Sequence, residues 1–364
     1  MAFAERYKKA HPECRILVVT GERGRFLAEK AKQTAAEVEC EFLTDFPFPR
    51  SRGVEFFFQL CQFLLKFVRA FWKSGEILKR FQPDLSVGFG SYVAFPGLWE
   101  SHQKKIPTLV HEQNRSMGQA NAWIARFADR IAVSFEENGW IPPQSPRVVT
   151  GLPLRLALVE SAERKNRSTP PLFSSDRMRI LILGGSQGSR SLNYLWWRTL
   201  DRFSHEEKKR VAVIHITGRE DYEKLRALYR ESGVEAKIYP FYERMEELYP
   251  EADLAVTRAG AGTLFELALF ALPAVVVPYP HAEAHQESNA RYFEERGGAI
   301  TLLERKGESE RMKREILELM KSPGLRNRMA ESLRRIAIPD GAERLVAAAD
   351  ALLEERMVRE EVTA

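Results

Sequence analysis

The chain has 364 residues, more than one hydrophobic core usually accommodates, so we expect two domains of about 150 to 200 residues each. Its 55 lysine and arginine residues against 50 acidic residues leave a net charge of +5. This mild excess favours phosphates or an anionic membrane surface as partners and does not require nucleic acid. Three cysteines without CxxC spacing offer neither a disulfide framework nor a zinc site.

Short β-branched runs alternate with helical patterns along the chain. The predicted strands are residues 15–19, 107–111, 130–134, 179–183, 211–217, 253–257 and 274–280. Continuous apolar strands with helices between them predict an α/β fold whose parallel sheets are covered on both faces. The charged, proline-interrupted segment 156–178 separates the two series, and we interpret it as the linker side of a domain boundary.

The most apolar stretch is FFFQLCQFLLKFVRAFW, residues 56–72. Polar residues recur in and just after it at helical spacing and form one narrow stripe: Gln59, Gln62, Lys66, Arg69 and Lys73. A membrane-spanning helix would not carry these charges. Two alternatives remain, a buried core helix and an interfacial helix flanked by Arg50, Arg52, Lys79 and Arg80.

Three glycine turns follow apolar runs and precede helical patterns: residues 88–92 (GFGSY), 184–188 (GGSQG) and 258–263 (RAGAGT). Backbone N–H groups at such helix N-termini can bind phosphate. The second turn lacks the GxGxxG pattern of dinucleotide-binding folds and the GK[ST] ending of a P-loop, which disfavours NAD and P-loop ATP binding. The alternative is a tight strand-to-helix turn without a ligand.

Polar side chains surround the third turn. Arg258 supplies a permanent charge suited to a diphosphate, and Glu266 lies one helical turn on, where it could accept ribose hydroxyls. Gln286 and Asn289 could bind a sugar from a loop. His281 and His285 are spaced like a metal-binding pair, but they lack the HExxH glutamate, so we predict no metal site.

Together these motifs resemble the MurG family of peptidoglycan N-acetylglucosaminyltransferases. The resemblance spans about residues 2 to 350 and rests on segments in register: VGFGSYVAFP, PTLVHEQNRSMGQAN, GLPLR, GGSQGSRSLN, PFYERM, RAGAGTLFELA and PYPHAEAHQESNA. It implies a GT-B fold, in which two Rossmann-like domains face a cleft. The domains would be residues 1–154, joined by a C-terminal segment 338–360 that crosses back, and residues 155–337.

The resemblance implies inverting transfer of GlcNAc from UDP-GlcNAc to the C4 hydroxyl of MurNAc in undecaprenyl-diphosphate lipid I, which gives lipid II for cell-wall synthesis. The chain contains no DxD pair, so we expect a metal-independent reaction without a cofactor. It also implies a peripheral protein at the cytoplasmic face of the inner membrane, with no nucleic-acid partner. This favours lipid contact by the apolar stretch, through Phe57, Leu64, Phe67, Phe71 and Trp72.

Residue roles follow from the resemblance, position by position. For the donor diphosphate and ribose it implies Ser186, Gln187, Gly188, Arg258, Ala261, Gly262, Thr263, Leu264, Phe265 and Glu266. Phe241 and Tyr242 would border the uracil, and Gln286 and Asn289 would read the GlcNAc. Asn114 and Arg155 would complete the donor site from the other side of the cleft. The acceptor diphosphate would meet Gly88, Gly90, Ser91 and Tyr92.

One departure concerns the N-terminus. The family begins with a strand and a glycine-rich loop ending in histidine, whereas MAFAERYKKAHPE already resembles the helix that follows. Because the first strand is central in such a sheet, we expect two neighbouring strands to lack ladder partners. Either the natural reading frame starts further upstream, or the protein binds UDP-GlcNAc without turning it over.

The catalytic base depends on the same departure, because the histidine of the absent loop is the family's usual candidate. His111 and Glu112, at the end of a predicted strand, are the substitutes we expect to face the cleft. Two other GT-B functions remain open as alternatives, a diacylglycerol glycosyltransferase and a UDP-GlcNAc 2-epimerase.

Overall fold

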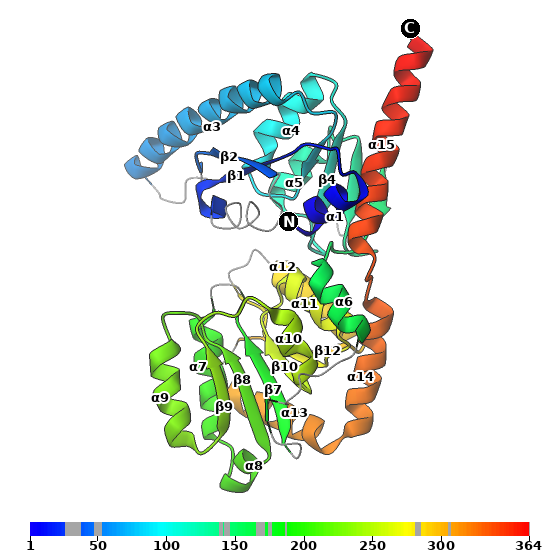
Figure 1. Ribbon diagram of the computed structural model, residues 1–364. Coiled ribbons are helices and arrows are strands. Elements are labelled where there is room, and N and C mark those ends of the chain that lie inside the picture. The colour runs from blue at the N-terminus through cyan, green and yellow to red at the C-terminus, as the bar shows by residue number, and fades with distance from the viewer. Residues whose placement is uncertain are drawn as a thin grey trace. The chain divides into compact units, whose positions relative to one another are not determined.

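A computed structural model describes residues 1–25, 38–46, 53–137, 141, 146–164, 172–173, 177–185, 188–280, 285–304 and 307–363. The chain divides into two compact units (Figure 1). Unit 1 comprises Met1–Pro153 and Asp340–Ala364, and unit 2 comprises Leu154–Pro339. The divisions fall within two residues of those expected from the sequence. Helix α6 (Leu156–Arg164) occupies the start of the segment interpreted as a linker, so that interpretation was wrong for these residues.

Unit 2 contains one parallel sheet of six strands in the order β12-β11-β10-β7-β8-β9. The strands are β7 (Met178–Leu183), β8 (Val211–Ile216), β9 (Glu235–Tyr239), β10 (Leu254–Thr257), β11 (Ala274–Val276) and β12 (Ala299–Thr301). The chain reverses its direction of winding between β7 and β10. In doubly wound sheets, ligands bind beyond the carboxyl ends of the strands at this reversal.

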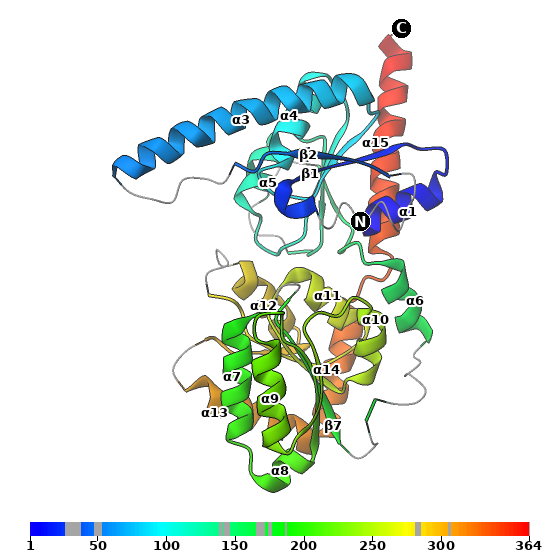
Figure 2. The same ribbon diagram turned by 60° about the vertical axis from the view of Figure 1, so that its left-hand side comes forward.

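Helices cover both faces of this sheet (Figures 1 and 2). The helices described in unit 2 are α6, α7 (Arg190–Asp201), α8 (His205–Lys209), α9 (Tyr222–Ser232), α10 (Met245–Leu248), the 3-10 helix η2 (Tyr249–Glu251), α11 (Ala261–Leu269), α12 (His285–Glu295), α13 (Glu308–Lys321) and α14 (Pro323–Ile336). The core joins strand residues such as Ile180 to Trp196 of α7 and Ile316 of α13, all fully buried. This double coverage explains why these strands read as continuous apolar runs.

Unit 1 contains two separate parallel sheets, β1-β2 and β3-β4-β5-β6. Its strands are β1 (Ile16–Gly21), β2 (Val38–Leu43), β3 (Ser86–Gly88), β4 (Thr108–Glu112), β5 (Arg130–Val133) and β6 (Arg147–Val149). Its helices are α1 (Ala2–Ala10), the 3-10 helix η1 (Glu22–Gly24), α3 (Val54–Phe81), α4 (Ala94–Gln103), α5 (Gln119–Ile124) and α15 (Gly341–Thr363).

The core of unit 1 lies on both faces of the four-stranded sheet. Phe3 of α1 and Leu345 of α15 pack with Leu109 on one face, and Leu98 of α4 and Ile124 of α5 pack with Val110 on the other. The C-terminal helix therefore belongs to the N-terminal unit, as expected. All seven predicted strands are present, whereas β2, β3, β6, β9 and β12 were not predicted because their short or mixed sequences carry little apolar periodicity.

The strands of unit 1 form two sheets that are not paired with each other within the described residues, in line with the expectation that two strands lack ladder partners. In unit 2, β7 pairs with β8 on one side and with β10 on the other. Within the described residues of unit 1, β1 pairs only with β2 and β3 pairs only with β4, and no strand joins them. Consequently β1 is only partly covered, with Val19 41% exposed, whereas every residue of β8 is buried.

Hydrogen exchange should reveal these open edges. In β1, the amides that point away from β2 should exchange on the order of 100-fold faster than those of β7, because they have no carbonyl partner in the ladder. Residue-resolved exchange measured by NMR makes the comparison, with the β2-facing amides of β1 as the internal control. Equal protection of both sets of β1 amides would contradict the split sheet.

Candidate functional site

The carboxyl ends of β7 and β10 carry two glycine turns that lead into helices. In the first turn, the N–H of Gly188 donates to the Gly185 carbonyl over 3.0 Å, and Gly188 has a φ of +78°. A Cβ at Gly188 would lie 2.6 Å from the Thr217 carbonyl oxygen, so both conformation and space require glycine. Ser186 and Gln187, expected to bind the diphosphate, lie outside the described residues.

The second turn ends at the N-terminus of α11. The N–H of Leu264 donates to the Gly260 carbonyl, which is the first hydrogen bond of the helix. The N–H groups of the three residues before it, Ala261, Gly262 and Thr263, have no partner among the described residues. A Cβ at Gly260 or Gly262 would meet no atom within 4 Å. The turn therefore offers unpaired donors and the positive end of a helix dipole to open space.

Leu264 and Phe265 of the same helix point into the core and not toward this space. They are buried, and the Phe265 ring packs edge-on against Phe293 with centroids 5.8 Å apart. Their side chains therefore cannot contact a ligand at the turn, which corrects the expected role of these two residues.

Arg258, directly after β10, connects the two turns. Its guanidinium donates to Ser189 Oγ (3.0 Å), Ser191 Oγ, the carbonyls of Val277 (3.0 Å) and Pro278 (3.4 Å), and Glu304 Oε1 (3.2 Å). The side chain is buried, and the residue is 4% exposed. These bonds use the donors that a diphosphate would need. Arg258 therefore holds the turns together in this structure, and the expected direct contact with a diphosphate stays a prediction.

Glu266 lies on the second turn of α11, half-buried. Its Oε2 accepts a 2.6 Å hydrogen bond from the hydroxyl of Tyr249, and its Oε1 accepts none among the residues that the structure describes. Burial raises the pKa of Glu266, while the Tyr249 hydrogen bond and the charge of Arg155 oppose that shift. Tyr249 was not predicted as a site residue, because no motif spacing marks an aromatic residue 17 positions before its partner.

Arg155 belongs to unit 2, which corrects its expected place on the opposite domain. Its guanidinium donates to the Glu243 carbonyl over 3.3 Å and lies 3.7 Å from the carboxylate of Glu246. The charge of Arg155 acts on both Glu266 and Tyr249. Arg155 of the GLPLR segment and Glu266 of the RAGAGTLFELA segment thus interact electrostatically within one unit.

Gln286 and Asn289 lie on α12 and not in a loop, which corrects the expected local structure. Gln286 Oε1 accepts from the N–H groups of Ala259 (3.1 Å) and Tyr279 (2.9 Å), so its amide nitrogen is directed away from these loops. Asn289 is fully buried and donates to the Ala259 carbonyl over 3.2 Å. Asn289 therefore supports the turn from the protein interior. His281 lies outside the described residues.

Phe241 and Tyr242 follow the carboxyl end of β9. Phe241 is exposed, and the hydroxyl of Tyr242 donates to Glu247 Oε2 over 2.6 Å. This hydrogen bond, with smaller contributions from burial and charge, raises the pKa of Tyr242 to about 12. The pair provides an apolar ring surface at the same edge of the sheet as the glycine turns.

In unit 1, Glu112 organises the loop that follows β4. Its carboxylate accepts from the backbone and side-chain nitrogens of Asn114 (2.8 and 3.2 Å), from the Gly118 N–H (3.0 Å) and from Asn121 Nδ2 (2.8 Å). These four hydrogen bonds occupy both carboxylate oxygens with groups of the same loop and of α5. The expected candidate role of Glu112 as the base is not supported.

His111 is likewise integrated into the core of unit 1. Its Nε2 donates to the Gly151 carbonyl over 3.1 Å, and burial lowers the pKa of His111 to about 4. Both His111 and Glu112 are 2% exposed. A general base must reach the proton that it removes, so this arrangement argues against either residue as the base.

The turn after β3 carries the residues expected to meet the acceptor. Gly90 (φ +81°) and Ser91 (φ +72°) are both left-handed, which is an uncommon conformation for serine. Tyr92 is exposed and donates from its hydroxyl to Gln119 Oε1 over 2.9 Å. A Cβ at Gly88 would lie 2.4 Å from Leu98, so this glycine allows α4 to pack closely.

Helix α3 carries an exposed apolar stripe and a separate inner face. The exposed stripe consists of Phe57, Phe58, Leu64, Leu65, Val68 and Trp72. Phe67 and Phe71 lie on the inner face and pack against Phe95, and Phe67 also packs against Phe46, which corrects their expected membrane contact. Figures 1 and 2 show the N-terminal end of α3 extending beyond the strands of unit 1.

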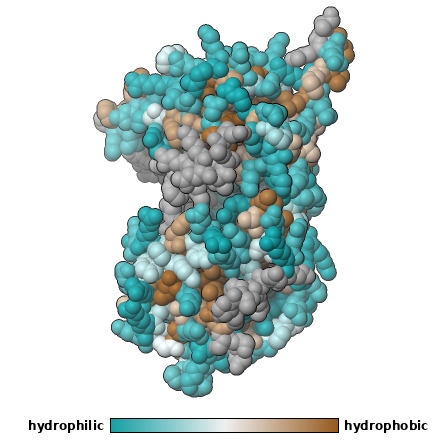
Figure 3. All heavy atoms as spheres, viewed as in Figure 1, coloured by the Kyte–Doolittle hydropathy of each residue, from teal (hydrophilic) through white to brown (hydrophobic). Residues whose placement is uncertain are grey.

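On the face drawn in Figure 3, small groups of hydrophobic side chains lie within a mainly hydrophilic surface. None of the helices in the described parts of the chain is both long and apolar enough to cross a membrane. The described side chains also contain no group of three or more histidine, cysteine, aspartate or glutamate residues placed to hold a metal ion.

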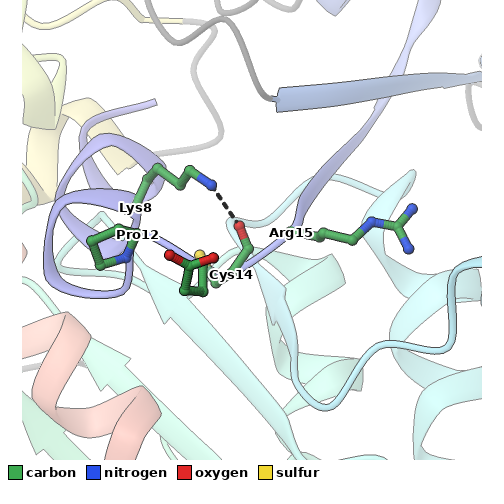
Figure 4. A pocket seen from close by; sticks show the side chains of 5 residues that line it. Lys8, Pro12, Cys14 and Arg15 are labelled. Atoms are coloured by element: carbon green, nitrogen blue, oxygen red, sulfur yellow. Dashed lines mark hydrogen bonds between the residues drawn. The ribbon is translucent and has the colours of Figure 1, made fainter.

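An open hollow of about 620 Å³ lies in unit 1 between α1 and β1 (Figure 4). Lys8 and Arg15 line it, but Lys8 donates to the Cys14 carbonyl over 2.8 Å and Arg15 pairs with Glu39. This hollow is not at the carboxyl ends of the strands and is not part of the candidate site.

Comparisons with known proteins agree with this architecture. The N-terminal domain of glycosyltransferase family 28 matches residues 1–133, and its C-terminal domain matches residues 179–345. A relative from Carboxydothermus hydrogenoformans, named UDP-N-acetylglucosamine--N-acetylmuramyl-(pentapeptide) pyrophosphoryl-undecaprenol N-acetylglucosamine transferase, is 32% identical over 355 residues. The match covers 97% of this chain and 93% of that protein.

The chain belongs to the MurG family. The crystal structure of Acinetobacter baumannii MurG, 26% identical, superimposes with a TM-score of 0.72 and covers 96% of this chain and 94% of that one. The chain is thus a family 28 glycosyltransferase with the GT-B fold. A UDP-GlcNAc 2-epimerase from Neisseria meningitidis bound to UDP-GlcNAc reaches a TM-score of 0.58 at 12% identity, covering 92% and 99% of the two chains, which reflects a shared fold alone.

Removing Arg258 should destabilise unit 2 strongly. Arg258→Ala should lower the free energy of unfolding by roughly 3 to 5 kcal/mol, because it leaves Glu304 and four other acceptors without their buried donor. Arg190→Ala is the matched control, since Arg190 and its partner Glu220 are exposed, and it should cost less than about 1 kcal/mol. Urea unfolding measures the free energy of unfolding of both variants. Equally small decreases in the two variants would contradict the role of Arg258 in holding the turns together.

Proposed function

We propose that this MurG-family chain transfers GlcNAc from UDP-GlcNAc to the C4 hydroxyl of MurNAc in undecaprenyl-diphosphate lipid I and produces lipid II. The observation that carries the proposal is the pair of glycine turns at the reversal of the unit 2 sheet, with Glu266 one helical turn beyond the second. The names of relatives that match nearly the whole chain support the same donor and acceptor.

The donor diphosphate would lie at the N-termini of α7 and α11. The unpaired N–H groups of Ala261, Gly262 and Thr263, together with residues 186 and 187, would bind its oxygens. Gly188, whose N–H is bonded to the Gly185 carbonyl, would shape the first turn. As the acceptor hydroxyl forms its bond to the anomeric carbon, the bond to UDP breaks and charge builds on the diphosphate. Helix dipoles would stabilise that charge. The chain has no DxD pair, which supports metal-independent transfer.

Side chains around the turns would read the rest of the donor. Glu266 would accept the ribose hydroxyls through its free Oε1, and the exposed Phe241 with Tyr242 would border the uracil. The amide nitrogen of Gln286 would donate to GlcNAc hydroxyls. Asn289 would act only by supporting the Ala259 carbonyl.

Unit 1 would supply the acceptor site. The turn Gly88–Tyr92, which includes Gly90 and Ser91, would meet the acceptor diphosphate at the N-terminus of α4. Asn114 is held by Glu112, and its contact with the donor stays a prediction. His111 and Glu112 are both buried and hydrogen-bonded, which argues against either as the group that takes the proton of the C4 hydroxyl.

The assay for this proposal is transfer of labelled GlcNAc from UDP-GlcNAc to a short-chain lipid I analogue. The expected product carries a β-linked GlcNAc and forms equally well in EDTA. Gly262→Leu should leave the melting temperature unchanged or slightly higher, because a Cβ at this position meets no protein atom within 4 Å, yet lower kcat/KM at least about 10-fold by filling the space of the diphosphate.

Glu223→Ala removes an exposed carboxylate on α9 that pairs with Arg226, and it serves as the control that should keep full activity. Binding of UDP-GlcNAc without transfer would favour the alternative of a protein that binds the donor and does not react. Transfer to diacylglycerol or formation of the 2-epimer in place of lipid II would reject the proposal. Full activity of Gly262→Leu would reject the assignment of the diphosphate site.

We further propose that the exposed stripe of α3 contacts the cytoplasmic face of the membrane, where the lipid acceptor resides. Phe57 is 67% exposed and Trp72 is 70% exposed, and the stripe runs along the helix between them. Contiguous exposed apolar side chains of this kind mark interaction surfaces. Lys66 and Arg69 on the same helix supply positive charge for anionic lipid head groups.

Vesicle binding tests this surface. The triple variant Phe57→Ser, Leu64→Ser and Trp72→Ser should lower binding to anionic phospholipid vesicles at least about 10-fold without lowering the melting temperature, since all three side chains are exposed. Transfer to a water-soluble acceptor analogue should stay unchanged. In the matched control, Phe67→Ser should lower the melting temperature, because Phe67 packs inward. Unchanged vesicle binding by the triple variant would refute the contact.

A further inference from the structure

Glu266 has its two carboxylate oxygens in different environments. Oε2 accepts the 2.6 Å hydrogen bond from Tyr249, whereas Oε1 accepts none within the described residues. Without a fixed partner, a glutamate side chain samples many rotamers and loses entropy when a ligand fixes one of them. A single bond to a buried hydroxyl removes much of that freedom before the ligand arrives.

Tyr249 is itself rigidly held. It is 1% exposed, and its ring stacks on Phe270 with centroids 5.1 Å apart and planes inclined by 29°. Burial, followed by the negative charge of Glu266, raises the pKa of Tyr249 well above its usual value. The hydroxyl therefore remains a donor at physiological pH, and the carboxylate is its acceptor.

Charges and burial act on the Glu266 carboxyl group in opposite directions. Burial raises the pKa of Glu266, the Tyr249 hydrogen bond and the charge of Arg155 lower it, and the charge of Glu246, on α10, raises it. Arg155 also lies 3.7 Å from Glu246 and therefore partly compensates that repulsion. The arrangement leaves Oε2 of Glu266 fixed by Tyr249 and Oε1 available as an acceptor.

We propose that Tyr249 is the positioning residue for ribose recognition: its hydroxyl fixes Oε2 of Glu266 so that Oε1 accepts a ribose hydroxyl of the nucleoside diphosphate. The proposal rests on the proposed function, in which Glu266 binds the donor ribose. Tyr249 touches neither ribose nor diphosphate and acts only through Glu266. It should therefore influence selection between ribose and deoxyribose more than catalysis in general.

The experiment compares UDP-GlcNAc with its 2′-deoxy and 3′-deoxy ribose analogues as donors in the transfer assay. The unmodified chain should prefer UDP-GlcNAc by about 10- to 100-fold in kcat/KM over the analogue that lacks the recognised hydroxyl, as expected for a hydrogen bond to a charged group. Tyr249→Phe, which keeps the ring against Phe270, should reduce that preference to a third or less. Its activity with the deoxy analogue should change little, because that donor never used the bond.

Tyr229→Phe is the matched control. It also removes a buried tyrosine hydroxyl from unit 2, but that hydroxyl bonds Trp196 over 2.7 Å and His215 over 2.9 Å instead of Glu266. It should lose a similar amount of stability and keep the full preference for UDP-GlcNAc. Equilibrium titration with UDP and 2′-deoxy-UDP or 3′-deoxy-UDP repeats the comparison without turnover and at low temperature, so that a destabilised variant is still measured in its folded form.

Glu266→Ala separates the two levels of the argument, because alanine can neither accept nor donate a hydrogen bond through its side chain. If Glu266→Ala keeps the preference for UDP-GlcNAc, Glu266 does not read the ribose, and this part of the proposed function fails. If Glu266→Ala loses the preference while Tyr249→Phe keeps it, the positioning role of Tyr249 alone is overturned. Equal loss in Tyr249→Phe and Tyr229→Phe would show a general structural effect and would also overturn that role.

Discussion

The buried guanidinium of Arg258 is the constraint on which the carboxyl edge of unit 2 depends. A permanent charge with 4% exposure must be fully hydrogen-bonded, since an unpaired buried charge costs several kcal/mol. Its acceptors are Ser189 and Ser191 at the start of α7, two carbonyls after β11 and Glu304 after β12. One side chain thus fixes the loops that follow four strands relative to one another.

This fixed edge accounts for the open donors beside it. Because Arg258, Gln286 and Asn289 hold the loops from within, the N–H groups at the start of α11 can remain unpaired without the turn collapsing onto them. Gly260 and Gly262 leave the space in front of these groups free. Preorganised donors of this type stabilise a developing charge without reorganisation during the reaction. The same logic applies to Glu266, whose carboxylate is held by a buried tyrosine.

Unit 1 uses a related device around a negative charge. Glu112, the buried last residue of β4, accepts hydrogen bonds from the following loop and from α5. Its carboxylate thus connects these segments in unit 1, as the Arg258 guanidinium connects the loops in unit 2. Within the described residues of unit 1, however, no strand joins the two sheets as β7 joins the two halves of the unit 2 sheet. The strands of unit 2 are therefore locked by pairing on both sides of β7, whereas β1 and β3 depend on pairing at a single edge.

The sequence by itself determined the α/β class, the seven apolar strands, the three glycine turns and the position of the unit boundary, because each depends on local periodicity or on backbone conformation. The sequence also predicted that two strands of unit 1 lack ladder partners, and the described residues of this unit form two separate sheets. Only the tertiary structure decided which polar residues of the site remain available. Arg258, Asn289, His111 and Glu112 carry the chemistry expected of ligand-binding or catalytic groups, yet each is buried and hydrogen-bonded within its own unit. Tyr249 gained its place beside Glu266 by the packing of η2 against α11, a contact that no spacing in the sequence encodes.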